Sequence, residues 1–294
     1  MSEAIDQAWR TAHPLPPTGA DDDKNSRGRI LLVGGSRLVP GGLRLTAEAA
    51  MRVGASKVRM ATVAACAVPL GLAMPECGVV ALPETADGEI AAAAVSVLAD
   101  HLPPCHALIL GPAMGGRGEA QALVRATLAE ARQGLSILLD AAAMTCCAGL
   151  EDAVRRHDGR VVLTPHHGEM AALMKCPIED VAADPQAAAL ATARRFGALV
   201  VLKAARTFVA APDGRLLWHD SDCAGLATAG SGDVLAGVIG GLLARGADPM
   251  VAAGWGVWLH SAAGNDAAAR FGPVGFLARD LAAALPRLLA AHGR

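Results

Sequence analysis

The sequence lacks the features of a nucleic-acid-binding protein. It contains no tyrosine, and aromatic residues make up only 3% of its 294 residues, which argues against a stacking surface for single strands. Its 26 lysine and arginine residues nearly balance its 28 aspartate and glutamate residues, so no net positive charge points to nucleic acid or to an anionic membrane. We therefore expect neither as a partner.

The cysteines and the hydrophobic runs exclude further classes. The seven cysteines are odd in number and include no CxxC pair, which suits neither a zinc knuckle nor a disulfide framework and favours a reducing cytoplasm. Residues Met1 to Asn25 contain no apolar segment of the secretory type. The longest run without a charged residue or a histidine, Met60 to Pro75, has 16 residues broken by Pro69 and Gly71, which is too short to span a membrane.

Short apolar runs alternate with longer helical patterns along most of the chain. The runs are rich in Val, Ile and Leu and rarely alternate with polar residues, which is typical of strands covered on both faces. Strands are predicted at residues 29–33, 57–62, 107–110, 136–139, 161–163 and 199–203. Helices are predicted at residues 42–54, 88–101, 118–133, 168–174 and 185–196. This alternation predicts a three-layer α/β/α sandwich with a mostly parallel central sheet.

The pattern changes after Lys203. Residues 207–211 and 215–219, joined by Pro212-Asp213-Gly214, predict a β-hairpin. Further helices are predicted at residues 233–245, 249–270 and 277–291. No linker or internal repeat follows residue 28, so we expect an N-terminal tail over residues 1–28 and a single domain over residues 29–294. The tail ends in Lys24–Gly28, which is typical of a mobile lead-in.

The sharpest local signal is the turn Gly230-Ser231-Gly232-Asp233, which opens an apolar helix. Free N–H groups at a helix start favour an anion, and the glycines let a phosphate approach the backbone. In the structural alternative, Ser231 only caps the helix and Asp233 complements its dipole. In the functional alternative, Asp233 orients or deprotonates an attacking hydroxyl. The helix start should favour the ionised form of Asp233 and leave it a weak base.

Other polar and glycine-rich segments follow predicted strands, where the ligands of open α/β folds gather. They are Gly34–Gly42, Gly111–Gly115, Asp140, Thr164–Glu169 and Lys203. Each has a structural alternative as a turn, a cap or a strand end, and the adjacent His166 and His167 are poor joint zinc ligands. Neither the dinucleotide-binding GxGxxG motif nor a P-loop motif is present. His260, in the predicted helix 249–270, is interpreted first as a packing or oligomer contact.

Taken in this order, the segments resemble the NAD(P)H-hydrate dehydratase family of the ribokinase-like superfamily. The matching blocks are Gly34-Gly35-Ser36 with Gly41-Gly42, Gly111-Pro112-x-Met114-Gly115, Thr164-Pro165-His166-x-Gly168-Glu169, Val201–Thr207 and Gly225–Gly237. The resemblance covers about residues 24–290. It implies a ribokinase-like fold and a lyase that uses ADP, or ATP, to dehydrate the S epimer of hydrated NADH or NADPH. The chemistry that the resemblance implies is phosphorylation of the C6 hydroxyl of the substrate and then elimination of phosphate, with AMP and phosphate as products.

The resemblance also implies roles for particular residues. By this resemblance, Asp233 would be the catalytic residue that acts on the reacting hydroxyl. Substrate binding is implied for Gly42, Gly115, His166 and Asp233. Nucleotide binding is implied for Lys203, Ala204, Ala205, Arg206, Thr207, Gly230, Ser231 and Gly232. Asp140 and Glu169 are candidates for a metal or water contact, Mg²⁺ is the implied cofactor, and relatives of this kind often form homotetramers.

The sequence departs from the family pattern at several positions. Ala142 stands where a second carboxylate is usual, Cys223 where asparagine is usual, and Ala204 where glycine is usual. Three functions therefore stay open: the dehydratase, a ribokinase-like small-molecule hydroxyl kinase, and a catalytically weakened nucleotide-binding relative. The blocks Thr164–Glu169 and Gly111–Gly115 favour the dehydratase. The epimerase activity of longer family members is not expected.

Overall fold

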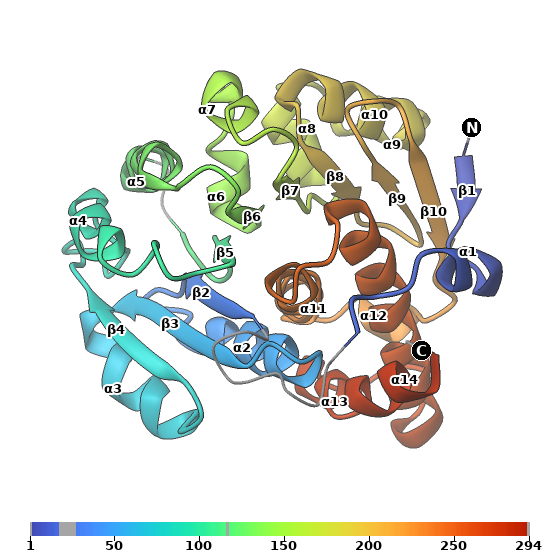
Figure 1. Ribbon diagram of the computed structural model, residues 1–294, viewed down its shortest axis with the longest axis horizontal. Coiled ribbons are helices and arrows are strands. Elements are labelled where there is room, and N and C mark those ends of the chain that lie inside the picture. The colour runs from blue at the N-terminus through green and yellow to red at the C-terminus, as the bar shows by residue number, and fades with distance from the viewer. Residues whose placement is uncertain (1, 18–27, 116–117, 293–294) are drawn as a thin grey trace.

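The fold is built around one ten-stranded sheet (Figure 1). The computed structural model describes residues 2–17, 28–115 and 118–292. Across the sheet the strand order is β1-β10-β9-β8-β7-β6-β5-β2-β3-β4. The strands are β1 (Ser2–Ala4), β2 (Arg29–Val33), β3 (Lys57–Val63), β4 (Gly78–Leu82), β5 (Ala107–Leu110), β6 (Ser136–Leu139), β7 (Val161–Leu163), β8 (Leu199–Leu202), β9 (Arg206–Ala210) and β10 (Leu216–Asp220).

Helices fill the connections between most of these strands. The α-helices are α1 (Gln7–Ala12), α2 (Gly42–Arg52), α3 (Ala64–Ala73), α4 (Val95–Ala99), α5 (Gly118–Glu130), α6 (Ala141–Thr145), α7 (Glu151–Arg155), α8 (His167–Met174), α9 (Ile178–Ala183), α10 (Pro185–Phe196), α11 (Ser231–Ala244), α12 (Pro249–Phe271), α13 (Ala278–Ala282) and α14 (Leu285–His292). Short 3-10 turns η1 and η2 cover Ala92–Ala94 and Ala224–Leu226.

The sheet confirms the predicted, mostly parallel arrangement. From β4 to β8 all neighbouring strands pair in parallel. Strand β9 pairs antiparallel with both β8 and β10, which forms the predicted hairpin at one end of the sheet. All the predicted strands are present. Lys203, predicted as the last residue of its strand, lies just beyond β8 and forms a parallel bridge with His166.

The core consists of two hydrophobic clusters, one on each face of the sheet. In β2, the buried side chains of Ile30 and Leu32 belong to one cluster, whereas those of Leu31 and Val33 belong to the other. The first cluster is completed by α2, α11 and α12, and the second by α5, α8 and α10. This two-sided burial explains the uninterrupted apolar strands and confirms the three-layer α/β/α prediction.

Glycines allow α11 to lie close to α2 and to the sheet (Figure 1). A methyl group at Gly237 would lie 2.3 Å from the carbonyl oxygen of Thr46, and one at Gly240 would lie 2.3 Å from Cδ1 of Ile109. Every residue of α11 except Gly232 and Asp233 is buried. The packing therefore fixes the start of α11 against neighbouring elements.

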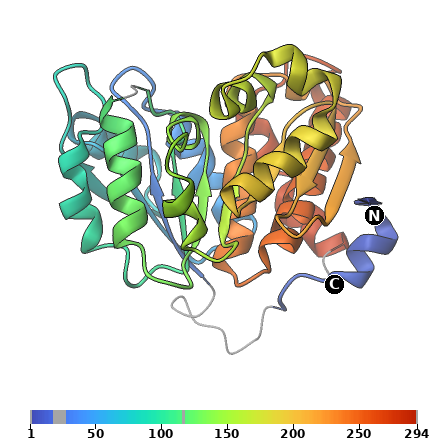
Figure 2. The ribbon, with the colours of Figure 1, turned by 90° about the horizontal axis from the view of Figure 1, so that it is seen from above.

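The first residues of the chain are part of the folded core, and Figure 2 shows helix α1, in blue, at the end of the molecule that holds the orange strands. Strand β1 pairs in parallel with β10, and the Trp9 side chain of α1 is only 6% exposed. A methyl group at Gly254 of α12 would lie 2.4 Å from Cη2 of Trp9, so that glycine makes room for the indole ring. Ile5 and Leu15 are also buried, and these apolar residues explain why residues 2–17 of the predicted tail are ordered. Residues 24–27 of the predicted lead-in lie outside the described residues.

Some elements differ from the prediction. Helix α3 and strand β4 were not predicted, and neither were β1 or the short helices α1, α6, α7 and α9. The predicted helix 88–101 begins only at Ala92, with the turn η1. The reason is a local turn, in which the amide groups of Gly88 and Glu89 bond to Thr85 and Ile90 bridges to Glu84. Across the described ranges, no helix is long and apolar enough to cross a membrane.

Candidate functional site

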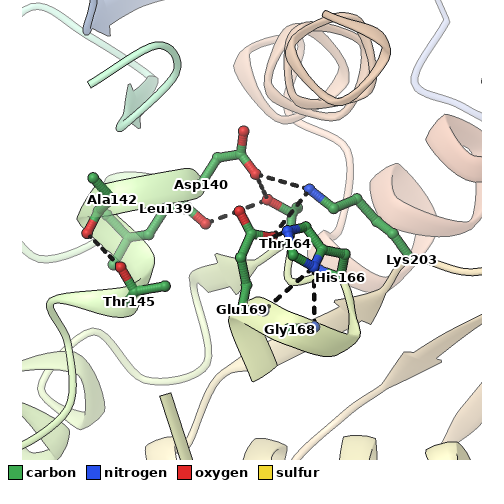
Figure 3. Close-up of polar contacts among 9 residues, drawn as sticks. All are labelled: Leu139, Asp140, Ala142, Thr145, Thr164, His166, Gly168, Glu169 and Lys203. Atoms are coloured by element: carbon green, nitrogen blue, oxygen red, sulfur yellow. Dashed lines mark hydrogen bonds and ion pairs between the residues drawn. The ribbon is translucent and has the colours of Figure 1, made fainter. Parts of the chain in front are cut away.

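Polar side chains that follow three neighbouring strands meet at the carboxyl ends of these strands (Figure 3). Asp140 follows β6, Thr164 follows β7 and Lys203 follows β8. The hydroxyl of Thr164 donates a hydrogen bond to Oδ1 of Asp140 at 2.6 Å, and Nζ of Lys203 lies 3.2 Å from the same oxygen. Asp140 is only 3% exposed, so its charge is held in place by these two donors.

Lys203 is the central cation of this group. Its Nζ also lies 3.6 Å from Oε2 of Glu169, and its backbone N–H donates to the carbonyl oxygen of Pro165 at 2.7 Å. Burial alone would lower the pKa of Lys203, but the charges of Asp140 and Glu169 outweigh burial and raise it. Lys203 is therefore a permanent positive charge at the carboxyl end of β8.

His166 caps the start of α8. Its Nδ1 accepts hydrogen bonds from the backbone N–H groups of Gly168 at 3.0 Å and Glu169 at 3.3 Å, while Oε2 of Glu169 accepts from the His166 backbone N–H at 2.8 Å. This reciprocal cap keeps Nδ1 without a proton, so Nε2 carries the proton of the neutral ring. Nε2 lies 3.6 Å from Oε2 of Glu169, and the His166 side chain lines the cavity described below.

The predicted anion turn lies directly beside Lys203. Gly230 has a φ of +86°, a left-handed conformation that glycine adopts at no steric cost, and α11 begins at Ser231. A methyl group at Gly232 would lie 3.5 Å from Nζ of Lys203. An anion bound at the N–H groups of Gly232 and Asp233, in the first turn of α11, would therefore also meet the ammonium group.

The pKa of Asp233 is shifted in the direction opposite to the one predicted from the sequence. Burial raises its pKa to about 6, the nearby charge of Asp140 adds to the rise, and Lys203 opposes it. The prediction considered only the dipole of α11, which favours the ionised form, and this effect is smaller than desolvation of the carboxylate. Asp233 is thus a stronger base than predicted, and it still ionises near neutral pH.

Two of the predicted glycine-rich loops meet beside the carboxylate of Asp233. A methyl group at Gly42 would lie 3.1 Å from Oδ2 of Asp233 and 2.6 Å from Cβ of Ala113. Gly35 donates its N–H to the carbonyl oxygen of Pro112 at 2.8 Å, which joins the two predicted loops. Gly115, the other predicted substrate-binding glycine, donates its N–H to Oε2 of Glu89 at 2.9 Å. The sequence analysis did not identify Glu89.

A cavity of about 680 Å³ opens beside Lys203 and the anion turn. This volume is in the range of sites for ligands of nucleotide size. Its lining residues are His166, Lys203, Ala204, Ala205, Thr207, His219, Ser221, Asp222, Cys223, Ala224, Leu226, Ala227, Thr228, Ser231, Gly232, Leu235, Val257, His260 and Ser261. Most predicted nucleotide-binding residues are in this set.

Two predicted nucleotide-binding residues, Arg206 and Gly230, are not in the cavity wall. The Arg206 guanidinium is bound by both carboxylate oxygens of Asp220, at 2.6 and 2.7 Å, and lies 4.7 Å from the ring centre of Trp218. These contacts hold the Arg206 side chain on the hairpin. Gly230 instead supplies the backbone turn that precedes α11.

The structure also assigns a site position to His260, which was predicted as a packing or oligomer contact. Its ring lines the cavity, and Nε2 lies 2.9 Å from Oγ of Ser231. The sequence signal was one histidine in the stretch of residues 249–265, which contains no Asp, Glu, Lys or Arg. Two of the positions that depart from the family pattern can also be placed. Cys223 lines the same cavity. Ala142, where a second carboxylate is usual, lies farther from Lys203 than Asp140 does (Figure 3).

The residues present do not form a protein-held site for Mg²⁺. Within residues 2–17, 28–115 and 118–292, no group of three or more His, Cys, Asp or Glu side chains could hold a metal ion. Asp140 and Glu169, the candidates for a metal or water contact, both lie beside the ammonium of Lys203. A Mg²⁺ ion that arrives with nucleotide phosphates and its own waters would belong to the co-substrate.

Comparison with known proteins identifies the family of this chain. The profile of the NAD(P)H-hydrate dehydratase family matches residues 30–287. The chain is 44% identical over 279 residues to an ADP-dependent (S)-NAD(P)H-hydrate dehydratase from Xanthomonas campestris, covering 95% of this chain and 93% of that protein. It is 36% identical to a bifunctional NAD(P)H-hydrate repair enzyme from Moorella thermoacetica, covering 96% of this chain and 53% of that longer protein.

Solved structures give the same result. A ribokinase-like superfamily protein from Enterococcus faecalis has a TM-score of 0.84 at 25% identity, covering 99% of this chain and 96% of that one. An ADP/ATP-dependent NAD(P)H-hydrate dehydratase from Bacillus subtilis, co-crystallised with ATP and Mg²⁺, has a TM-score of 0.82 at 26% identity, covering 99% and 98%. The ribokinase-like fold is confirmed, and this chain belongs to the NAD(P)H-hydrate dehydratase family.

Proposed function

We propose that this protein dehydrates the S epimer of hydrated NADH or NADPH and uses ADP as the phosphoryl donor. The observation that carries the proposal is the position of Asp233. Its carboxylate lies between Gly42 and the anion turn, where Lys203 is adjacent. A hydroxyl group held beside Gly42 would face a nucleotide phosphate bound at this turn.

The proposed reaction begins with phosphoryl transfer. The C6 hydroxyl oxygen of the hydrate attacks the terminal phosphorus of ADP, an O–P bond forms, and the bond to AMP breaks. Asp233 takes the hydroxyl proton, a role for which a pKa of about 6 is well suited near neutral pH. Lys203 and the N–H groups at the start of α11 neutralise the charge on the transferred phosphoryl group.

Elimination then restores the nicotinamide ring. The lone pair of the ring nitrogen expels phosphate from C6, and a proton leaves the neighbouring C5 as the double bond forms. Phosphate is a far better leaving group than hydroxide, which explains why a nucleotide is consumed. His166 lines the cavity, and we propose that its ring binds a phosphate or substrate oxygen there.

The decisive experiment supplies purified protein with S-hydrated NADH, Mg²⁺ and either ADP or ATP. We expect NADH absorbance to return with one AMP formed per NADH when ADP is the donor, and no return with the Asp233→Asn variant. A stable phosphorylated hydrate would identify a hydroxyl kinase instead. Nucleotide binding with no product would identify a non-catalytic relative.

We also propose a homotetramer in a reducing cytoplasm. Helix α3 exposes Val68 and Leu72, at 72% and 81%, an apolar face of the kind that subunit contacts cover. All seven cysteines are free thiols, as a reducing compartment requires. Light scattering on the purified protein tests the subunit number, and a monomer at working concentration would contradict it.

A further inference from the structure

His260 reaches from α12 to the first residue of α11. Its Nε2 lies 2.9 Å from Oγ of Ser231 and 3.0 Å from the carbonyl oxygen of the same residue. Both residues line the cavity beside Lys203. Figure 1 shows α12 packed alongside α11, so two well-packed helices fix this contact.

The contact with the carbonyl oxygen determines where the proton of His260 lies. A carbonyl oxygen can only accept a hydrogen bond, so Nε2 must carry a hydrogen and act as the donor. The same N–H is shared with Oγ of Ser231, which therefore accepts and does not donate. Burial lowers the pKa of His260 to about 4, and the positive charge of Lys203 also disfavours protonation. The ring is accordingly neutral at working pH, with its hydrogen on Nε2.

This arrangement leaves the proton of the Ser231 hydroxyl without a protein acceptor. In the described part of the chain, His260 is the hydrogen-bonding partner of Oγ of Ser231, and Nε2 cannot accept. The backbone N–H of Ser231 is already bonded to the carbonyl oxygen of Thr228 at 3.2 Å. The hydroxyl can therefore direct its proton into the cavity, next to the anion turn and Lys203.

We infer that His260 is a positioning residue that turns the Ser231 hydroxyl into a hydrogen-bond donor for the terminal phosphate of the bound nucleotide. This inference rests on the proposed function, since it specifies how the same site holds its co-substrate. An imidazole that donates to Ser231 fixes the hydroxyl before the nucleotide arrives. The nucleotide then gains a directed hydrogen bond without the cost of ordering the side chain.

The experiment is a double-mutant cycle on ADP binding, measured by calorimetry on the purified protein with Mg²⁺. Ser231→Ala removes a hydrogen bond to a charged group, so the Kd for ADP should rise by about 10-fold. His260→Leu should raise the Kd by about 5-fold in the native background and by less than about 2-fold in the Ser231→Ala background. His260→Gln keeps an N–H donor of similar reach and should restore most of the affinity.

A matched control separates positioning from general stability. His157 is also buried, its Nε2 lies 3.1 Å from the carbonyl oxygen of Leu128, and neither residue lines the cavity. His157→Leu should lower the Tm and leave the Kd for ADP unchanged. In steady-state assays, His260→Leu should raise KM for ADP and leave KM for the hydrate unchanged.

Each outcome bears on the inference. Unchanged ADP affinity in Ser231→Ala, or additive effects of the two substitutions, would overturn it, and if His260→Leu does not fold, Ser231→Ala and His260→Gln still decide. A native protein that binds ADP but does not dehydrate the hydrate would refute the proposed function, while the binding cycle would still test His260. A native protein that binds no ADP would overturn both.

Discussion

We expect the Asp233→Asn variant to be inactive and yet more stable than the native protein at neutral pH. The pKa of Asp233 is raised from its ordinary value of 3.8 to about 6, chiefly by burial. The folded state therefore holds this proton more tightly than the unfolded state does. The native protein loses stability as the pH rises from 3.8 to about 6, and the loss is complete at higher pH. Asparagine, which does not ionise, avoids this loss.

The magnitude follows from the same pKa values. The difference between 3.8 and about 6 corresponds to at most about 3 kcal/mol, because one pKa unit is worth about 1.4 kcal/mol. The carboxylate is partly exposed, so solvent screening reduces this gain to about 1.5–2 kcal/mol. The substitution also loses about 0.5 kcal/mol of interaction with the N-terminus of α11. The desolvation effect is larger, and the net gain should raise the Tm by about 2 °C.

Thermal melts at pH 7.5 and pH 4 test this reasoning. The gain should be present at the higher pH and nearly absent at the lower one, where Asp233 of the native protein is protonated. Asp152→Asn is the matched control, since Asp152 also lies in the first turn of a helix but its side chain is 99% exposed. The control should show no gain at either pH. An Asp233→Asn variant that is no more stable at pH 7.5, or equally stabilised at pH 4, would refute the reasoning.

Three further predictions concern the site. First, kcat/KM should fall as the pH drops below about 6, where Asp233 gains its proton. Asp140→Asn should move this fall to lower pH, because it removes a negative charge that raises the pKa of Asp233. A fall at the same pH in the variant would show that Asp140 does not affect the pKa of Asp233. Second, Gly42→Ala should raise KM for the hydrate by about 10-fold or more, since the new methyl group would lie 3.1 Å from Oδ2 of Asp233. Gly41→Ala is the control and should have normal kinetics, because a methyl group there would meet open space. Equal effects of the two substitutions would contradict the placement of the hydrate beside Gly42. Third, Lys203→Met should abolish ADP binding in calorimetry, and native-like ADP affinity would refute the role of Lys203. The same substitution should lower the free energy of unfolding, measured in urea, by about 3 kcal/mol, because Asp140 would be buried without its cation.

The parallel part of the fold could be predicted from local patterns. Strands such as β2 and β5 are buried on both faces, so each is a continuous apolar run that a sequence displays directly. Strand β1 could not be found in this way, because it is defined by pairing with residues more than two hundred positions away in β10. Helix α3 contains Pro69, and proline is normally read as a helix breaker, which conceals the element.

The site was predictable where one motif holds several functional groups. The segment Gly230–Asp233 combines a left-handed glycine, a helix start and a carboxylate, and the structure places it beside Lys203 as expected. The protonation of Asp233 was not predictable, because it depends on how deeply α11 is packed and on the distant Asp140. His260 escaped detection because its partner lies 29 residues earlier, on another helix.

The pairing of β1 with β10 and of Trp9 with Gly254 has a consequence for biosynthesis. These residues are synthesised more than two hundred residues before their docking surface on β10 and α12, so they stay undocked until that surface has been made. The cavity wall, which extends to Ser261, is likewise incomplete until then. A nascent chain without these elements therefore cannot gain stability from a bound nucleotide, and the apolar residues that pack against them stay exposed for that part of synthesis.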